Sequence, residues 1–599
     1  MHDSTWTRSS VQDSVRVNGA HTGSSASADV SVRSLVEQER ERLSIELGLI
    51  SDQPATHAHR PHERPFTRAE RPFTTILFGG LTWKHEHLIQ AIFEGLGYTA
   101  SYLPTPDVRA FQLGKEYGNN GQCNPTYFTV GNLVKHLQHL EEQGFDRQQI
   151  NDSFVFFTAG ACGPCRFGMY ENEFRLALRN AGFDGFRVLI LQQTGGLNQA
   201  EVEAGLEMNL DFTLGIVNAM NIGDILNDVA YQIRPFEIEE GATDRALSEC
   251  IEIMATALRE KRNFELGSTL PLVERLTHVK DPLDVLGKFG QQLFGSEIIV
   301  AAERCREVFR TVRVDRTRLR PIVKITGEFW AQTTEGDGNF NMFRFLEREG
   351  AQVLVEPIAT WLLYMLHQVK QELEDKKYLD VERGDSPVVS MLAHVRSWGA
   401  YKRKKAIFSL AEVLFKREYE RLRAALGDMP HELTDQYEMQ RMGHPYYNTR
   451  VEGGEGHLEI AKNIYYTNKS LCHMVLSVKP FGCMPSTQSD GVQSAVTSHF
   501  KDIIYLPIET SGEGEINAHS RVQMALGEAR AKAKAELLGA LERAGLTLDS
   551  FRDYVQRTPE LQDPFYRVPE VPGVVGIAAR LALHVGARIE ATRGEVAVA

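Results

Sequence analysis

Short apolar runs alternate with longer amphipathic segments along most of the chain from residue 74 onward. Apolar positions recur with helical spacing in segments such as HEHLIQAIFEGLGY, whereas the runs between them are rich in strand-forming residues, as in ILFGG, ASYLP, FVFF and FRVLILQ. Strands that alternate with helices are typical of βαβ units and a parallel sheet. The pattern therefore predicts a first α/β lobe over residues 71–240.

The same alternation begins again at Pro321. The predicted strands of this second part are PIVKITGEFW, QVLVEP, HMVLSVKP and DIIYLPIET, and a long helical stretch over residues 388–426 lies among the predicted helices. We therefore predict a second α/β lobe with long helices over residues 320–545. Residues 241–319 are mostly helical in pattern and are predicted to connect the two lobes.

Both ends of the chain differ in pattern from the two lobes. Residues 1–70 are rich in Ser, Thr, His and Arg, which is typical of a disordered tail, and one accessory helix is predicted within them over residues 30–50. Residues 546–599 are predicted to form a C-terminal tail with a late apolar segment, VVGIAARLALHV.

The composition is that of a large globular protein, with 42% hydrophobic and 24% charged residues and a net charge of −13. We expect no binding to duplex nucleic acid or to an anionic membrane from so acidic a chain. Seven cysteines without regular spacing suit a reducing compartment. Because the first residues lack the apolar core of a signal peptide and no apolar run is long enough to span a bilayer, we predict a cytoplasmic protein.

The segment Ser153–Phe174 joins a predicted buried strand to a predicted helix through a glycine-bracketed pair of cysteines, Cys162 and Cys165. Loops at the carboxyl ends of strands are where α/β sheets bind ligands. Three chemistries are compatible with the CGPC sequence: a thioredoxin-type dithiol, a structural zinc site and an iron–sulfur cluster.

The surroundings of CGPC favour the third chemistry. Gly168 interrupts the helix into which a thioredoxin-type motif continues, and no proline lies between Pro164 and Pro235 to serve as the cis-proline of that fold. A structural zinc site usually has a second tight ligand pair, which the sequence lacks. An iron–sulfur cluster takes thiolates from distant loops, so this interpretation requires two more cysteines in similar loops.

Cys123 and Cys483 meet that requirement, because each follows a glycine within two residues and precedes a proline by two. With Cys162 and Cys165 they form the predicted ligand set of an iron–sulfur cluster, a four-iron, four-sulfide cluster by preference. Nearby helix N-termini are expected to stabilise the thiolates. A strand ending in AGACGP in the first lobe corresponds to one ending in PFGCMP in the second, so we expect the cysteine loops to face a central cleft.

The remaining cysteines have other surroundings. Cys472 precedes a predicted strand and is either a fifth ligand or a core residue. Cys250 and Cys305 lie within predicted helices, where a cysteine is more often a small core residue than a ligand.

Two carboxylates are candidate catalytic residues. Glu328 and Glu509 stand at predicted strand ends, where they are placed for proton transfer or for hydrogen bonding around the cluster. Glu171 lies in the first turn of a predicted helix, where a carboxylate is favourable without any catalytic role. Arg166 is either a counter-charge to the cluster or a surface residue.

Several strings of the sequence resemble the activase-related branch of the 2-hydroxyacyl-CoA dehydratase superfamily, described as CoA-substrate-specific enzyme activase-related or 2-hydroxyglutaryl-CoA dehydratase-like. The resemblance extends over about residues 74–541 and is carried by GQCNPTYFTVGNL, ACGPCRFGMYENEF, KITGEFW with FLEREGAQVLVEP, KPFGCMPS and IETSGEGEINAHSRVQ. It implies two flavodoxin-like lobes, cysteine-ligated iron–sulfur clusters and a low-potential electron supplied by a separate ATP-hydrolysing activase.

The resemblance implies an iron–sulfur protein that takes this electron and passes it on in 2-hydroxyacyl-CoA dehydratase-type chemistry. Two alternatives stay open: a dehydratase-like lyase that acts on an acyl-CoA substrate, and a thiol–disulfide oxidoreductase that uses Cys162 and Cys165. The sequence contains neither GxxxxGK[ST] nor the nucleotide-binding signature of an actin-like activase domain, so we do not expect the chain to hydrolyse ATP itself.

Overall fold

The chain forms two compact units, Met1–Pro61 and His62–Ala599. In the first unit the described residues form one helix, α1 (Val32–Glu46), where the sequence predicts a helix. All elements named below belong to the second unit, and the lobe boundaries predicted within it stay predictions. The computed structural model describes residues 32–46, 63–160, 165–192, 196–197, 204–261, 287–288, 290, 295–377, 379, 387–451 and 453–598.

The first lobe is built on a five-stranded sheet. Its strands are β1 (Thr75–Phe78), β2 (Thr99–Tyr102), β3 (Phe154–Gly160), β4 (Val188–Gln192) and β5 (Gly196–Leu197). Its helices are η2 (Arg68–Phe73), α2 (Trp83–Gly95), α3 (Val108–Tyr117), α4 (Asn124–Glu142), α5 (Arg147–Ser153), η3 (Arg166–Met169) and α6 (Tyr170–Asn180). The strand order is β2-β1-β3-β4-β5, in which β1 to β4 are parallel and β5 is antiparallel to β4. Alternate residues of β1 enter different cores, since Leu77 packs with residues of α4 and α6 whereas Ile76 and Phe78 pack with residues of α2.

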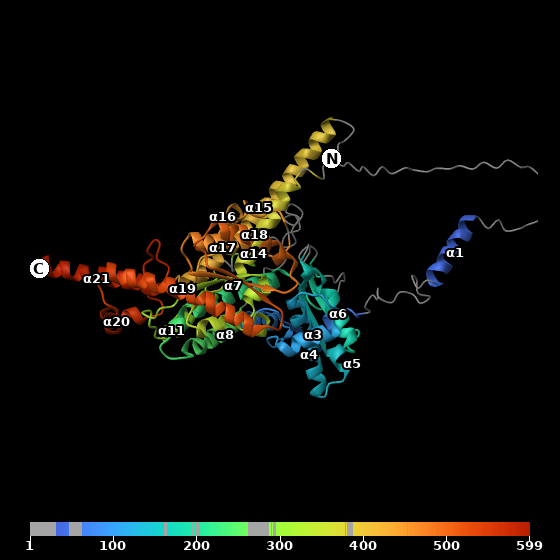
Figure 1. The fold of residues 1–599 in the computed structure, drawn as a ribbon. Coiled ribbons are helices and arrows are strands. Elements are labelled where there is room, and N and C mark those ends of the chain that lie inside the picture. Colours follow the sequence, from blue (N-terminus) through green and yellow to red (C-terminus); the bar gives the residue numbers. More distant parts are fainter. Residues whose placement is uncertain are drawn as a thin grey trace, which may run out of the picture. The chain divides into compact units, whose positions relative to one another are not determined.

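The second lobe is built on a four-stranded parallel sheet. Its strands are β6 (Ile322–Gly327), β7 (Gln352–Leu354), β8 (Met474–Pro480) and β9 (Tyr505–Thr510), in the order β7-β6-β8-β9. Its helices are α12 (Phe329–Thr333), η5 (Asp337–Asn339), α13 (Met342–Arg348), α14 (Ile358–Asp375), α15 (Pro387–Ala425), α16 (Gln436–Gly443), α17 (His457–Asn468), α18 (Met484–His499) and α19 (Glu515–Arg543). In the first sheet β1 lies between β2 and β3, and in the second sheet β6 lies between β7 and β8. This is the flavodoxin-like strand order. The predicted α/β fold with two parallel-sheet lobes is confirmed (Figure 1).

The two faces of the second sheet differ in chemistry. Val323, Ile325, Leu476 and Val478 form an apolar core with residues of α13 and α19. The other face, which α17 covers, is polar although it is buried. It carries the side chains of Lys324, Thr326, Ser477 and Lys479.

The lysines of this polar face form ion pairs with carboxylates on α17 and after β7. Lys479 forms an ion pair with Glu459 of α17 at 2.8 Å. Lys324 pairs with Glu356, and the Lys462 ammonium group lies 3.9 Å from the same carboxylate. Burial alone would raise the pKa of Glu356, but the two lysines hold it at about 2. These charges are therefore paired inside the lobe.

Helices inserted between the sheets include α7 (Leu210–Ile233), η4 (Arg234–Phe236), α8 (Ala242–Glu260) and α11 (Glu297–Arg310). The buried side chain of Asp224 on α7 accepts hydrogen bonds from the backbone N–H groups of Ile358 and Ala359, at 2.9 and 2.8 Å, at the start of α14. The same carboxylate lies 3.1 Å from Nε2 of His85 on α2. One residue of α7 thus connects a helix of the first lobe to a helix of the second.

Several element boundaries differ from the prediction. The strand predicted as PIVKITGEFW ends at Gly327, because Gly327 has φ +122° and Glu328 then caps α12 through its side chain. Helix α18 begins at Met484, since Cys483 is its N-cap residue. Helix α3 was not predicted, and helix α7 begins at Leu210, after residues 204–209, which are not helical.

The C-terminal residues predicted as a tail fold into ordered elements. These are α20 (Leu548–Arg557), η6 (Pro559–Gln562) and α21 (Ile577–Val598). The late apolar segment belongs to α21, and Leu581 and Val585 from it pack with Phe551 of α20 and Leu541 of α19 in a separate core. In the part of the chain that the structure describes, no helix combines the length and apolar character needed to cross a bilayer.

The Glu356→Gln variant is expected to be less stable at pH 7 by roughly 3 kcal/mol, because two buried lysines lose their shared anion. The pKa of Glu356 is about 2 in the folded protein, below that of a free glutamate, so its contribution is complete above about pH 5 and is lost as the pH falls toward 2. Thermal unfolding should therefore show a gap between variant and wild type that narrows from pH 5 to pH 3. The exposed pair Arg588–Glu560 provides the control, since Glu560→Gln should change little. A gap that is constant with pH would contradict this account.

Candidate functional site

Three of the predicted site residues lie at the carboxyl ends of strands in the two sheets. Cys165 is the N-cap residue of η3, shortly after β3, and Cys483 is the N-cap residue of α18, after β8. Glu328 follows β6 directly and caps α12. In each sheet the strand order reverses at these strands, and such switch points are where open α/β sheets bind ligands. Cys123 is the N-cap residue of α4, as the sequence predicts.

The loops that carry Cys123 and Cys483 are in direct contact. The backbone N–H of Asn124 donates a hydrogen bond of 3.1 Å to the carbonyl oxygen of Phe481. Gly482 has φ +75°, and a Cβ atom there would lie 3.3 Å from the carbonyl oxygen of Gln122 and 3.5 Å from Cα of Cys123. A glycine is therefore needed at residue 482 both for its backbone conformation and for this close approach.

The loop that carries Cys165 joins the same place. The hydroxyl of Tyr170, which begins α6, lies 3.2 Å from Sγ of Cys123, and Oγ1 of Thr126 lies 3.1 Å from that sulfur. The guanidinium group of Arg166 donates to the carbonyl oxygen of Gly121. Arg166 thus fixes the position of the neighbouring loop.

Two carboxyl groups share these surroundings, that of Glu455, which is buried, and that of Glu328, which is half-buried. Both carboxylate oxygens of Glu328 accept backbone hydrogen bonds at the start of α12, from Trp330 at 3.0 Å and from Ala331 at 2.9 Å. Glu455, in the loop before α17, accepts from the backbone N–H of Phe329. Burial raises the pKa of both carboxyl groups, and the negative charge of Glu328 raises that of Glu455 further.

The three described loop cysteines have raised pKa values. Burial is the main cause, and the charges of Glu455 and Glu328 add to it for Cys165, whose pKa is about 12. Burial and the charge of Glu328 likewise raise the pKa of Cys123 and of Cys483. The sequence predicts that helix N-termini favour the thiolate, but burial outweighs them here. As long as no metal ion displaces the proton, these thiols are neutral at pH 7.

The donor set fits an iron–sulfur cluster in kind, because such clusters take their ligands from cysteine thiolates. The loops that carry Cys123, Cys165 and Cys483 are in contact, whereas Cys162 lies outside the described residues. In the part of the chain that the structure describes, no group of three or more His, Cys, Asp or Glu side chains is placed to hold a metal ion, and this includes the three described loop cysteines.

The other candidate residues lie elsewhere. Glu509 is exposed on β9, and its neighbour Thr510 is the residue that faces the cysteine loops, where its hydroxyl accepts from the side chain of Asn124 at 3.2 Å. Glu171 pairs with Arg175 one helical turn away, which agrees with a role in the helix alone. Sequence reasoning missed Glu455, although the glycines on both sides of it, in GGEG, are a signal of unusual backbone.

The remaining cysteines are core residues. Cys472 packs with Ile322 and Val475 at the opposite end of β8 from Cys483, so it is not placed to be a fifth ligand. Cys250 on α8 and Cys305 on α11 are fully buried, and the thiol of each points to the backbone carbonyl of the other, at 3.5 and 3.6 Å. The prediction that these two are core residues is confirmed.

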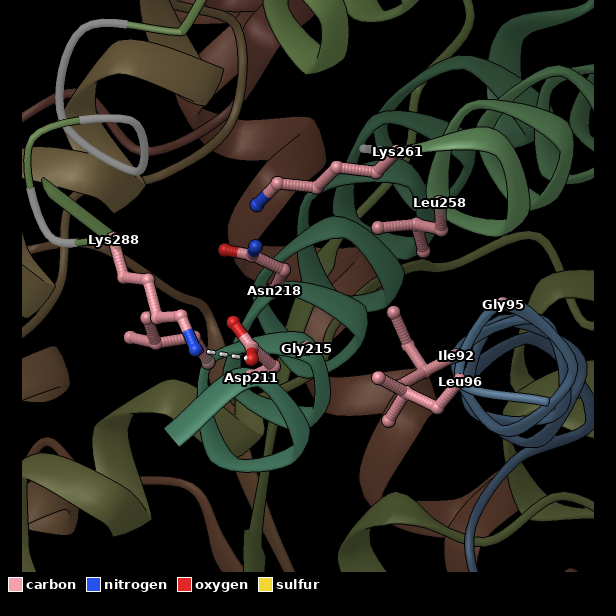
Figure 2. A pocket seen from close by; sticks show the side chains of 10 residues that line it. Ile92, Gly95, Leu96, Asp211, Gly215, Asn218, Leu258, Lys261 and Lys288 are labelled. Atoms are coloured by element: carbon pink, nitrogen blue, oxygen red, sulfur yellow. Dashed lines mark hydrogen bonds and ion pairs between the residues drawn. The ribbon is translucent and has the colours of Figure 1, made fainter. Parts of the chain in front are cut away.

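A separate pocket, lined by residues of α2, α7 and α8 and by Lys261 and Lys288, contains none of the loop cysteines. Figure 2 shows its lining side chains. Lys288 and Asp211 form an ion pair of 2.6 Å in it. Burial lowers the pKa of Lys261, although the negative charges of Glu418, Glu297 and Asp211 act against this. The lysines of the pocket therefore already face carboxylates, and none of the described site residues lines it.

Comparison of the chain with models of protein families, with curated proteins and with solved structures finds no match. The family resemblance thus stays an inference from the motifs quoted above.

The Gly482→Ala variant is expected to separate the Cys123 and Cys483 loops, because the new methyl group adds a close contact to an unfavourable φ. Gly545→Ala is the matched control, since Gly545 has φ +62° but open space around it. Both variants should lose about 1 kcal/mol of stability from the backbone, as measured by thermal unfolding. Only Gly482→Ala should also lower the iron retained per chain. Equal iron content in the two variants would show that the close approach is unimportant.

The Cys165 thiol of chelator-treated protein should react with iodoacetamide at pH 7 at least about ten times more slowly than the thiol of an unstructured peptide, because only the thiolate reacts. The rate should rise with pH beyond pH 9, and the double variant Glu328→Gln/Glu455→Gln should react faster than wild type. Peptide mass spectrometry resolves Cys165 from the other cysteines. A Cys165 that reacts faster than the peptide would instead favour dithiol chemistry.

Proposed function

We propose that the chain is an iron–sulfur protein that takes a low-potential electron from a separate ATP-dependent activase and passes it on in 2-hydroxyacyl-CoA dehydratase-type chemistry. The observation that supports this most is the convergence of the Cys123, Cys165 and Cys483 loops from two lobes. Cys162 is proposed as the fourth ligand. The partner and the acyl-CoA substrate class rest on the sequence resemblance alone.

When bound, a cluster would supply one-electron chemistry at this place. Residues of the chain would hold the cluster and tune it. The N-termini of α4 and α18 direct backbone N–H groups and positive dipole ends toward the cysteines, which favours an anionic group. Tyr170 and Thr126 orient the sulfur of Cys123 through their hydroxyl groups. Such contacts behind the ligands tune affinity and reduction potential.

A lyase is the second candidate, and the carboxyl groups of Glu328 and Glu455, whose pKa values are raised, favour it. Their raised pKa values allow a carboxyl group to keep its proton near neutral pH, so each is suited to protonate a leaving hydroxyl group. The thiol–disulfide alternative is less well supported, because the raised pKa of Cys165 opposes the thiolate that such an enzyme uses.

Protein purified without oxygen should be brown and should contain about four iron and four sulfide per chain, the content of one cysteine-ligated cubane. Cys123→Ala, Cys165→Ala and Cys483→Ala should each lower both values. Cys472→Ala is the matched control in the core, and it should keep the iron and lose only a packing contribution of about 1 kcal/mol.

Each of three results would favour a different function. Stoichiometric zinc without iron would indicate a structural metal site. A metal-free protein with a reversible Cys162–Cys165 disulfide would favour the oxidoreductase. Loss of water from a 2-hydroxyacyl-CoA in the presence of the reduced protein alone, abolished by Glu328→Gln, would favour the lyase.

A further inference from the structure

Four large apolar side chains are exposed around the cysteine loops, and we call them the loop patch. Phe481 and Met484 flank Cys483, and they are 58% and 46% exposed. Met169, at the end of the η3 turn that follows Cys165, is 53% exposed, and Ile516, in the first turn of α19, is 86% exposed. Phe481 and Met484 are exposed on the same loop, and exposed apolar side chains that lie close together, rather than singly, indicate an interaction site.

Backbone contacts connect the segments that carry the loop patch. The N–H of Phe481 donates to the carbonyl oxygen of Thr510 at 2.7 Å, at the end of β9, and β9 leads through Gly512 into α19. A Cβ at Gly512 would lie 2.7 Å from the ring of Phe111 on α3, so this turn is held against the first lobe. The patch therefore stands on fixed backbone, which lowers the entropy lost on binding.

The charge beside the loop patch is negative. Glu513 and Glu515 are exposed within three residues of Ile516, and Glu509 is exposed on β9. Arg166, on the other side, is held by the carbonyl oxygen of Gly121. A partner that matches this surface has an apolar centre and positive charges on its rim, since opposite potentials guide association.

We propose that the loop patch is the docking face for a protein redox partner whose exposed redox centre lies in an apolar surface ringed by lysine or arginine side chains. This proposal rests on the proposed electron-transfer function and adds to it the place of contact and the chemistry of the partner. Cys483 is buried and lies between Phe481 and Met484 in the sequence, so a partner that contacts these two side chains is brought near its sulfur. Apolar contact excludes water there, and the charged rim sets the orientation.

Cytochrome c is a suitable probe, because its haem edge is exposed within a ring of lysines. Titration calorimetry with the full chain should show binding at low ionic strength that weakens as salt is added. Phe481→Ser/Met484→Gln, Ile516→Gln and Glu513→Gln/Glu515→Gln should each weaken it by about tenfold. Matched controls lie farther along α19: Met524→Gln, where the side chain is 70% exposed, and Glu528→Gln/Glu542→Gln should bind as wild type.

Ile516→Gln keeps the test decisive if the variants beside Cys483 disturb folding, because Ile516 is remote from every loop cysteine in sequence and is almost fully exposed. Equal loss in the control variants, or wild-type binding by the Ile516→Gln and Glu513→Gln/Glu515→Gln variants, would overturn the docking face. Dimerisation of the chain that Ile516→Gln abolishes, seen by light scattering, would assign the patch to a second copy and would also overturn it.

Failure of the proposed function gives a different result. Patch-dependent binding of cytochrome c by a protein that contains no iron, or that transfers no electron after reduction with titanium(III) citrate, would support the surface and overturn the redox role. The opposite result is also possible. If the protein contains iron, is oxidised by a small dye, and is oxidised by cytochrome c at the same rate in wild type and in the patch variants, the function would be supported and the docking face overturned.

Discussion

The hydrogen bond between the Asn124 amide and the Phe481 carbonyl is the constraint on which the site depends. It joins a helix start in the first lobe to a strand end in the second, and the absence of a side chain at Gly482 allows the two backbones to meet. Neither lobe holds the three described loop cysteines alone, since Cys165 and Cys123 come from one and Cys483 from the other. The contact lies beside Cys123 and Cys483, which are both buried.

The second lobe contains two sets of carboxyl groups whose pKa values are shifted in opposite directions. On the face of the sheet below α17 each lysine has a carboxylate nearby, so Glu356 stays ionised at low pH. At the carboxyl end of the sheet Glu328 and Glu455 accept hydrogen bonds from backbone N–H groups, while burial and neighbouring carboxylates raise their pKa values. The same lobe therefore contains a region of paired charges around Glu356 and a region where carboxyl groups keep their protons more easily, around Glu328 and Glu455. The second region lies where the chemistry is proposed.

The sequence predicts most of the fold and part of the site, and the difference has a physical reason. Alternating strands and helices are visible because their hydrophobic periods differ, and Cys123 and Cys483 are recognisable as helix starts because proline follows each of them. Local signals of this kind do not give side-chain direction at a strand end. Glu509 and Thr510 are neighbours, yet only Thr510 faces Asn124, which is 386 positions away in sequence. Glu455 was missed because its partner, the Phe329 amide, is also far away in sequence, at 126 positions.

That separation has a consequence for the life of the protein in the cell. The ribosome completes the first lobe long before it makes Cys483, and domains generally fold as they are synthesised. During this time Cys123 and Cys165 have no counterpart from the second lobe and are open to oxidants and to stray metal ions. A cofactor that needs all three loops binds only after synthesis has passed α18. Its insertion then stabilises the joined form, because a ligand that binds only the native state shifts the folding equilibrium toward it.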